Sequence, residues 1–227
     1  METEMKKFIL LTILAFSFVD IFAMNPLPKR LMSTFGIDLN NINAINNEGE
    51  TALVLAAKTG NEKILAYVYK NINKSLRNKP SNDGLMPIHY AVREHKPKSV
   101  KFLLGKFKTN ANLPDNTEAK RTPIFYLIND PSKYPKSDVM LSALLIRVDS
   151  ILKHFLKKKV NLDYKDKTGK TVVEYIQEKV TTIDNIIDKA TKYAQQKSYI
   201  KEQNIQRNYL YAVKIKIETM QKKKKKR

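Results

Sequence analysis

The 227-residue chain contains no cysteine. Without thiols it forms neither a disulfide framework nor a thiolate metal site, although this absence suits oxidising and reducing compartments equally. Histidine is also scarce, with three residues in all. The chain has no His-Glu-x-x-His pair, no Gly-x-x-x-x-Gly-Lys-Ser/Thr loop and no Gly-x-Ser-x-Gly elbow. These absences predict a protein that is not an enzyme, with no catalytic, cofactor-binding or metal-binding residues.

Long apolar runs are missing as well. The clearest apolar run, residues 8–19, has 12 residues, whereas a helix needs roughly 20 to cross a bilayer. The run follows Lys6 and Lys7 and precedes Ala23, which is the order of parts in a signal peptide. We therefore expect residues 1–23 to direct export from the cytoplasm, to a periplasm or beyond, with cleavage near Ala23. An uncleaved membrane anchor is the alternative.

Negative charge is in the minority, because 42 Lys and Arg stand against 22 Asp and Glu, a net charge of +20. Losing residues 1–23, with two lysines and three carboxylates, would raise this to +21. Basic residues end the chain in one run: Lys222, Lys223, Lys224, Lys225, Lys226 and Arg227. Such a run is usually disordered and solvated. It also suits binding to anionic lipid or nucleic-acid phosphates, or a nuclear import address.

What the chain does have is a repeat. The position of Thr51 returns at Met86 after 35 residues and at Thr122 after 36. The repeated segments are residues 46–57, 81–92, 120–128 and 166–176. Their period, and the sequence Met86-Pro87-Ile88-His89, resemble the ankyrin repeat, whose period is near 33 with Thr-Pro-Leu-His at its centre. The resemblance implies an all-α solenoid of stacked helix-turn-helix units joined by β-turn or hairpin loops.

The repeat divides the chain into segments. Thr171 follows Thr122 by 49 positions, so the third unit carries an insertion. For this insertion we expect a loop and an added helical turn or two in 138–147. No proline or glycine follows Lys170, and the apolar spacing after it predicts one long amphipathic helix. The expected order is a signal peptide (1–23), a degenerate cap (24–45), repeats (about 46–80, 81–116, 117–165 and a partial 166–180), a C-terminal helix (181–220) and a polybasic tail (221–227).

Within each unit the turn residues have distinct tasks. Gly49, Gly84 and Gly169 stand where a tight turn needs a positive φ. Thr51, Thr122 and Thr171 are suited to cap the following helix. His89 is expected to tie neighbouring turns together, whereas His95, which replaces the glycine between two helices, is expected to be exposed.

The resemblance also implies a protein partner, held by the turn tips and the inner helices in a concave groove. The third-unit positions Glu118, Ala119, Arg121, Asn129 and Asp130 belong to a disrupted repeat, and Thr59 is a further first-unit position. Carried over position by position, the groove residues are Asn47, Glu48, Glu50, Lys58, Asn82, Asp83, Leu85, Arg93, Glu94, Lys167 and Lys170. Their charge changes from acidic in the first unit to basic in the last.

Two functions follow from these patterns. The first is a monomeric, exported adaptor that binds a protein, a host protein if the organism lives inside another cell. The second is a protein that binds an anionic membrane or nucleic acid through its basic C-terminal helix and lysine tail. Salt distinguishes them, because binding to nucleic-acid phosphates weakens steeply with salt and a protein groove contact changes little.

Overall fold

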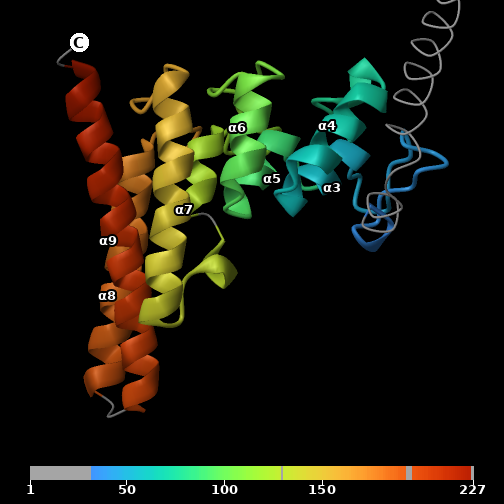
Figure 1. Ribbon diagram of the computed structural model, residues 1–227. Helices are drawn as coiled ribbons and strands as arrows, with labels where there is room; N and C mark the ends of the chain where they lie inside the picture. The colour runs from blue at the N-terminus through green and yellow to red at the C-terminus, as the bar shows by residue number, and fades with distance from the viewer. Residues whose placement is uncertain (1–31, 129, 193–195, 226–227) are drawn as a thin grey trace, which may run out of the picture.

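The computed structural model describes residues 32–128, 130–192 and 196–225. The expected signal peptide, residues 24–31 of the expected cap, Asn129, Lys226 and Arg227 lie outside this part of the chain. Within it the structure is helical, and the expected fold class is confirmed (Figure 1).

The first two repeats each form a pair of short helices. In the first, α3 (Ala52–Thr59) is followed by α4 (Glu62–Asn71), and in the second, α5 (Pro87–Arg93) is followed by α6 (Pro97–Gly105). The capping role of Thr51 is confirmed, because its hydroxyl accepts a hydrogen bond from the Val54 amide.

The third repeat departs from the expectation in its first helix, which is a 3-10 helix, η2 (Pro123–Leu127), where Thr122 makes no capping bond. The added helical turns expected in 138–147 are confirmed. After η3 (Pro131–Lys133) they run without interruption into the second helix, α7 (Asp138–Lys157). Helix α7 begins where the Ser137 hydroxyl accepts from the Met140 amide, and residues 138–157 contain no proline or glycine to end it.

The fourth repeat contradicts the expected single C-terminal helix. Helix α8 (Val172–Lys192) continues straight through the expected boundary at residue 180, and α9 (Lys197–Lys225) returns antiparallel to it (Figure 1). The stripe that includes Val180 and Ile183 on α8 packs against the stripe that includes Tyr209 and Val213 on α9. The apolar residues after Lys170 therefore form two stripes on two helices that pack against each other, and not one stripe along a single long helix.

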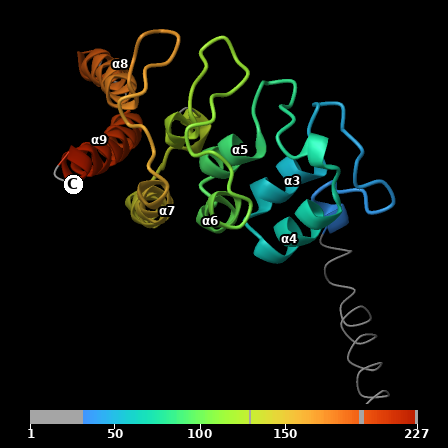
Figure 2. The same cartoon turned by 90° about the horizontal axis from the view of Figure 1, so that it is seen from above.

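Successive units stack in two layers (Figure 2). Helices α3, α5, η2 and α8 contact one another in order along the inner layer, and α4, α6, α7 and α9 form the outer layer beside them. The C-terminal helices are therefore the fourth member of the array, enlarged, and not an appendage. Because α7, α8 and α9 have 20, 21 and 29 residues against 10 for α4, they project far beyond the first two units (Figure 1).

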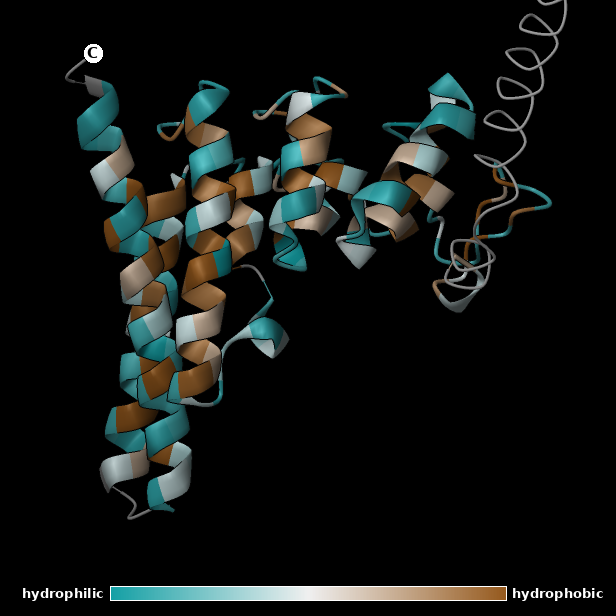
Figure 3. Ribbon diagram, viewed as in Figure 1, coloured by the Kyte–Doolittle hydropathy of each residue, from teal (hydrophilic) through white to brown (hydrophobic). Residues whose placement is uncertain are grey.

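Apolar residues gather where the layers meet. Apolar and polar bands alternate along each helix in Figure 3, as amphipathic helices require. One continuous cluster of buried residues runs from Met32 through α3 and α5 to Met220 in α9, so each unit is stabilised by its neighbours. Among residues 32–128, 130–192 and 196–225, no helix is long and apolar enough to cross a membrane.

The turns are joined to one another by backbone hydrogen bonds. The amides of Asn82, Asn116 and Lys167 donate to Glu48 O, Gly84 O and Ala119 O of the preceding turn, at 2.9, 2.8 and 2.8 Å. Gly84 has the expected positive φ, +78°, as do Gly49 and Gly169, and Lys120 takes φ +51° at the corresponding place in the third turn. This ladder fixes the spacing of the turn tips.

Candidate partner-binding surface

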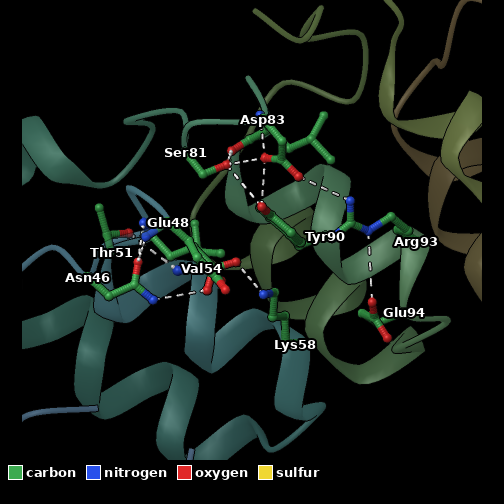
Figure 4. Close-up of polar contacts among 12 residues, drawn as sticks. Asn46, Glu48, Thr51, Val54, Lys58, Ser81, Asp83, Tyr90, Arg93 and Glu94 are labelled. Carbon is green, nitrogen blue, oxygen red and sulfur yellow. Dashed lines mark hydrogen bonds and ion pairs between the residues drawn. The ribbon is translucent and has the colours of Figure 1, made fainter. Parts of the chain in front are cut away.

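The first two turns and the inner helices behind them enclose a shallow concavity of about 430 Å³. We call it the concave groove, and Figure 4 shows its polar contacts. Seven of the residues expected there do line it, together with one, Tyr90, that was not expected. The lining residues are Asn47, Glu48, Glu50, Lys58, Asn82, Asp83, Tyr90 and Arg93.

Tyr90 lies beneath the polar side chains of this groove and is 2% exposed. Its ring has two cations close by, the Lys58 Nζ at 4.6 Å and the Arg93 guanidinium at 4.4 Å from the ring centroid. Its hydroxyl donates to Asp83 Oδ1 at 2.7 Å and lies 3.0 Å from the Ser81 hydroxyl. Tyr90 therefore connects the second turn to helix α3 of the preceding unit through Lys58 (Figure 4).

Asp83 is the acidic end of this cluster. Burial opposes its ionisation, but hydrogen bonds from Ser81 and Tyr90 and the charge of Arg93 hold its pKa below the ordinary value. Arg93 Nη1 donates to Asp83 Oδ2 at 3.2 Å. The carboxylate therefore stays charged at neutral pH, and it is exposed toward solvent at the turn tip.

Two expected groove residues are buried instead of presented to a partner. Glu50 is 3% exposed. Its carboxylate is paired with Lys58 and accepts a hydrogen bond from the side-chain nitrogen Nδ2 of Asn46. Leu85 is also 3% exposed and belongs to the apolar core. Both face inward because the chain turns at the preceding glycine, Gly49 or Gly84, which directs the next side chain under the turn.

Other expected residues combine exposure with structural bonds. The exposed Asn82 side chain donates to Asn47 O at 2.9 Å and so holds the first turn to the second. Glu94 pairs with Lys133 of the third unit at 2.9 Å. Of the expected residues in the first two units, Asn47, Glu48, Asn82 and Asp83 are the most accessible.

In the fourth unit the arrangement returns with its charges reversed. Lys170 stands in the place of Glu50, and Glu178, eight residues later, stands in the place of Lys58; the two pair at 2.8 Å. Lys167 is exposed at the turn tip. Arg121 of the third unit spans the junction, because its Nε donates to Asp166 Oδ2 at 3.0 Å. At the tips themselves, Glu48 and Asp83 are exposed in the first two turns, Glu118 and Lys120 share the third, and Lys167 is exposed in the fourth.

Sequence reasoning missed the tyrosines of the inner layer. Tyr90, Tyr126 and Tyr175 occupy the same place in units two, three and four, and each ring is almost fully buried. Tyr126 donates to Asp115 at 2.7 Å, and the Arg121 guanidinium lies 4.2 Å from the Tyr175 ring. The signal was available, since a tyrosine recurs at one position of the aligned repeats.

The histidines are structural. His89 Nδ1 accepts from the Met86 amide, which leaves Nε2 to donate to Leu113 O of the next loop at 3.0 Å, so its expected linking role is confirmed. His95 is not exposed as expected; it is 4% exposed, with Nε2 2.9 Å from the Tyr209 hydroxyl of α9 and 3.1 Å from Leu127 O. His95 is covered by helix α9, whose position the spacing of the repeats did not predict. Burial lowers the pKa of His89 and of His95 to about 4.

The start of the basic tail is helical, because α9 continues through Lys225. The expectation of a disordered run is therefore wrong for Lys222–Lys225. Lys224 Nζ donates to Val160 O at 3.1 Å. Lysine has good helix propensity, and the preceding turns of α9 are anchored by the buried Ile217 and Met220.

The described residues contain no cluster of His, Asp and Glu suited to a metal ion. Comparison with known families gives one finding: the model described as ankyrin repeats (3 copies) matches residues 21–116. Units three and four lie outside that match, although they continue the same stacking. A search of the curated proteins found no match to the chain.

Proposed function

Because the chain is an ankyrin-repeat protein over residues 21–116, and ankyrin repeats imply protein–protein interaction, we propose that it is an adaptor whose concave groove holds a protein partner. The protein acts as a monomer and performs no chemistry on that partner. The observation that carries the proposal is the convergence of the first two turn tips and Tyr90 around one concavity.

The charges of the turn tips favour a partner of defined polarity. Glu48 and Asp83 are exposed acidic tips of the first two turns, the third turn carries both Glu118 and Lys120, and Lys167 is the exposed basic tip of the fourth. Opposite charges across an interface set orientation and the rate of encounter. The partner segment therefore carries basic residues where it meets the first two units and an acidic residue where it meets the last.

We also propose that the adaptor acts outside the cytoplasm in which it is made. Support comes from the Lys6-Lys7 pair, the apolar run 8–19 and Ala23. If the organism lives inside another cell, a host protein is the expected partner. N-terminal sequencing of the exported form should begin near Met24; an intact Met1 would favour a membrane anchor.

The groove can be tested by site-directed photo-crosslinking, because the chain has no cysteine and a single introduced one is a unique attachment point. Glu48→Cys puts the label on an exposed turn tip that lines the concave groove, and Lys63→Cys is the control, an exposed charged residue on outer helix α4. The partner should be captured from Glu48→Cys and not from Lys63→Cys. Equal capture from both, or capture from Lys63→Cys alone, would contradict the proposal.

The captured polypeptide should then bind the unlabelled protein with an affinity that falls only moderately as salt rises, because few charged tips contact it. Steep loss of binding between about 50 and 200 mM salt would indicate phosphate-driven association of the kind that nucleic acid makes.

A further inference from the structure

A second hollow, larger than the concave groove, lies where α7 and α9 end. The two helices run side by side in the outer layer. Both end on the upper side of the molecule in Figure 1, where the C-terminus is marked. Together with the loop that follows α7 they enclose about 790 Å³. We call this the C-terminal groove. Its lining residues are Lys153, Leu156, Lys157, Lys159, Val160, Leu162, Lys223 and Lys224.

The floor of the C-terminal groove is apolar and its rim is cationic. Leu156, Val160 and Leu162 form the floor, and Leu156, 39% exposed, is open to solvent. The other five lining residues are lysines, and no carboxylate of the described chain lines the groove. Lys224 bonds to Val160 O across one edge, which fixes the end of α9 against the loop.

Helix ends explain only part of this charge. The last turn of an α-helix carries a partial negative charge, which a nearby lysine stabilises. That effect accounts for lysines such as Lys157 and Lys224 in the last turns of α7 and α9. It does not account for an open apolar hollow between them, because the end of a helix needs charge and not apolar surface. A ligand with an apolar part and several negative charges satisfies both features.

We propose that the C-terminal groove binds the surface of a membrane containing anionic phospholipid. The apolar floor receives the acyl and glycerol region of one lipid, and the lysines of the rim bind the phosphates of that lipid and its neighbours. A membrane fits better than a single fatty acid, whose one carboxylate would leave most of the five lysines unmatched. Each lysine held near an anionic surface strengthens binding roughly fivefold. This site is independent of the concave groove.

The absence of tryptophan from the chain provides a direct reporter. Leu156→Trp puts the only tryptophan on the floor of the groove, and Ile146→Trp puts it at an exposed position of α7 that does not line the groove. With vesicles of phosphatidylglycerol and phosphatidylcholine, the emission of Leu156→Trp should shift to shorter wavelength and that of Ile146→Trp should not. Equal shifts, or no shift for Leu156→Trp, would overturn the proposal.

A pair of lysine variants tests the rim in the full chain. Lys157→Gln with Lys223→Gln should weaken binding to the same vesicles roughly 25-fold, from the factor of about five for each lysine. The matched control, Lys63→Gln with Lys70→Gln, removes the same charge from exposed positions of α4 and should change binding much less. Vesicles of phosphatidylcholine alone measure any contribution of the apolar run 8–19, which every variant shares.

Three further outcomes would each overturn the proposal. If both lysine pairs weaken binding equally, the attraction comes from net charge and not from this groove. If an acidic amphipathic peptide shifts the emission of Leu156→Trp and anionic vesicles do not, the site belongs to a protein partner. If duplex RNA or DNA competes with the vesicles and binds without shifting the emission, the lysines serve nucleic acid. Circular dichroism of each variant confirms that it is folded.

Discussion

At the scale of single residues, the turns depend on a left-handed backbone position. Gly84 and Gly169 have nearly the same φ, +78° and +80°, but different surroundings. A Cβ at Gly84 would lie 3.0 Å from backbone atoms of Asn116 and Thr117, whereas a Cβ at Gly169 would meet nothing within 4 Å. Gly169→Ala should therefore cost only the strain of a positive φ, about 1–2 kcal/mol, and Gly84→Ala should cost more. Urea unfolding of both variants measures the difference, and equal losses would show that the contact between turns is unimportant.

The two buried histidines predict a fall in stability under mild acid. Each has a pKa of about 4 in the folded chain, below the 6.5 of an unfolded one. A depressed pKa means that the unfolded state binds protons first, so this stability is present above about pH 6.5 and is lost as pH falls toward 4. Between pH 7 and pH 5 each histidine should account for about 2 kcal/mol.

Urea unfolding at these two pH values, on the parent and on His89→Gln, checks this prediction. The variant should be less stable at pH 7, because glutamine can replace the Nε2 donor to Leu113 O but not the Nδ1 acceptor for the Met86 backbone amide. Its stability should fall less on acidification. An unchanged pH dependence would mean that His89 is not buried in its neutral form. The same comparison with His95→Gln tests the contact with α9.

At the scale of the element, α9 is an integral outer helix and not a tail. Its buried side chains include Ile205, Tyr209, Leu210, Val213 and Ile217. Ending the chain at residue 196 should therefore remove on the order of 5 kcal/mol or more, since each such side chain contributes roughly 1.5–3 kcal/mol on burial. Ending it at Gln221 removes the basic run 222–227, whose described side chains, Lys222, Lys223 and Lys224, are exposed, and should change stability by about 0.5 kcal/mol or less. Thermal melts that lose equal stability in the two truncations would contradict the role of α9.

The same element shows where prediction from sequence succeeded and failed. The period of the turns located α3 to α6, the positive φ of Gly84 and most of the concave groove, because these features are local to one repeat. The burial of His95 and the pairing of α8 with α9 depend on contacts between residues far apart, such as His95 with Tyr209. Local patterns contain no information on such partners. Glu50 and Leu85 were misplaced for a related reason, since the family pattern gives a position in the turn but not the side-chain direction.

At the scale of the whole molecule, the array presents opposite charges at its two ends. Glu48 of the first turn and Lys167 of the last are exposed tips at the ends of this gradient. The double variant Glu48→Lys with Lys167→Glu reverses the gradient and leaves the net charge unchanged. It therefore separates recognition by the turn tips, of which Glu48 lines the concave groove, from general attraction to a basic protein, which deletion of residues 222–227 tests instead.

The most direct measurement of the central claim uses the partner that crosslinking identifies, bound without a crosslink. Its dissociation rate is measured from the Glu48→Lys, Lys167→Glu variant and from the chain that lacks residues 222–227. If the concave groove holds the partner, the double reversal should raise the dissociation rate about tenfold or more, because tip charges contact the bound segment. The tail deletion should leave that rate unchanged and lower only the association rate. Abolished binding on tail deletion, with an unaltered dissociation rate for the double reversal, would contradict the adaptor account.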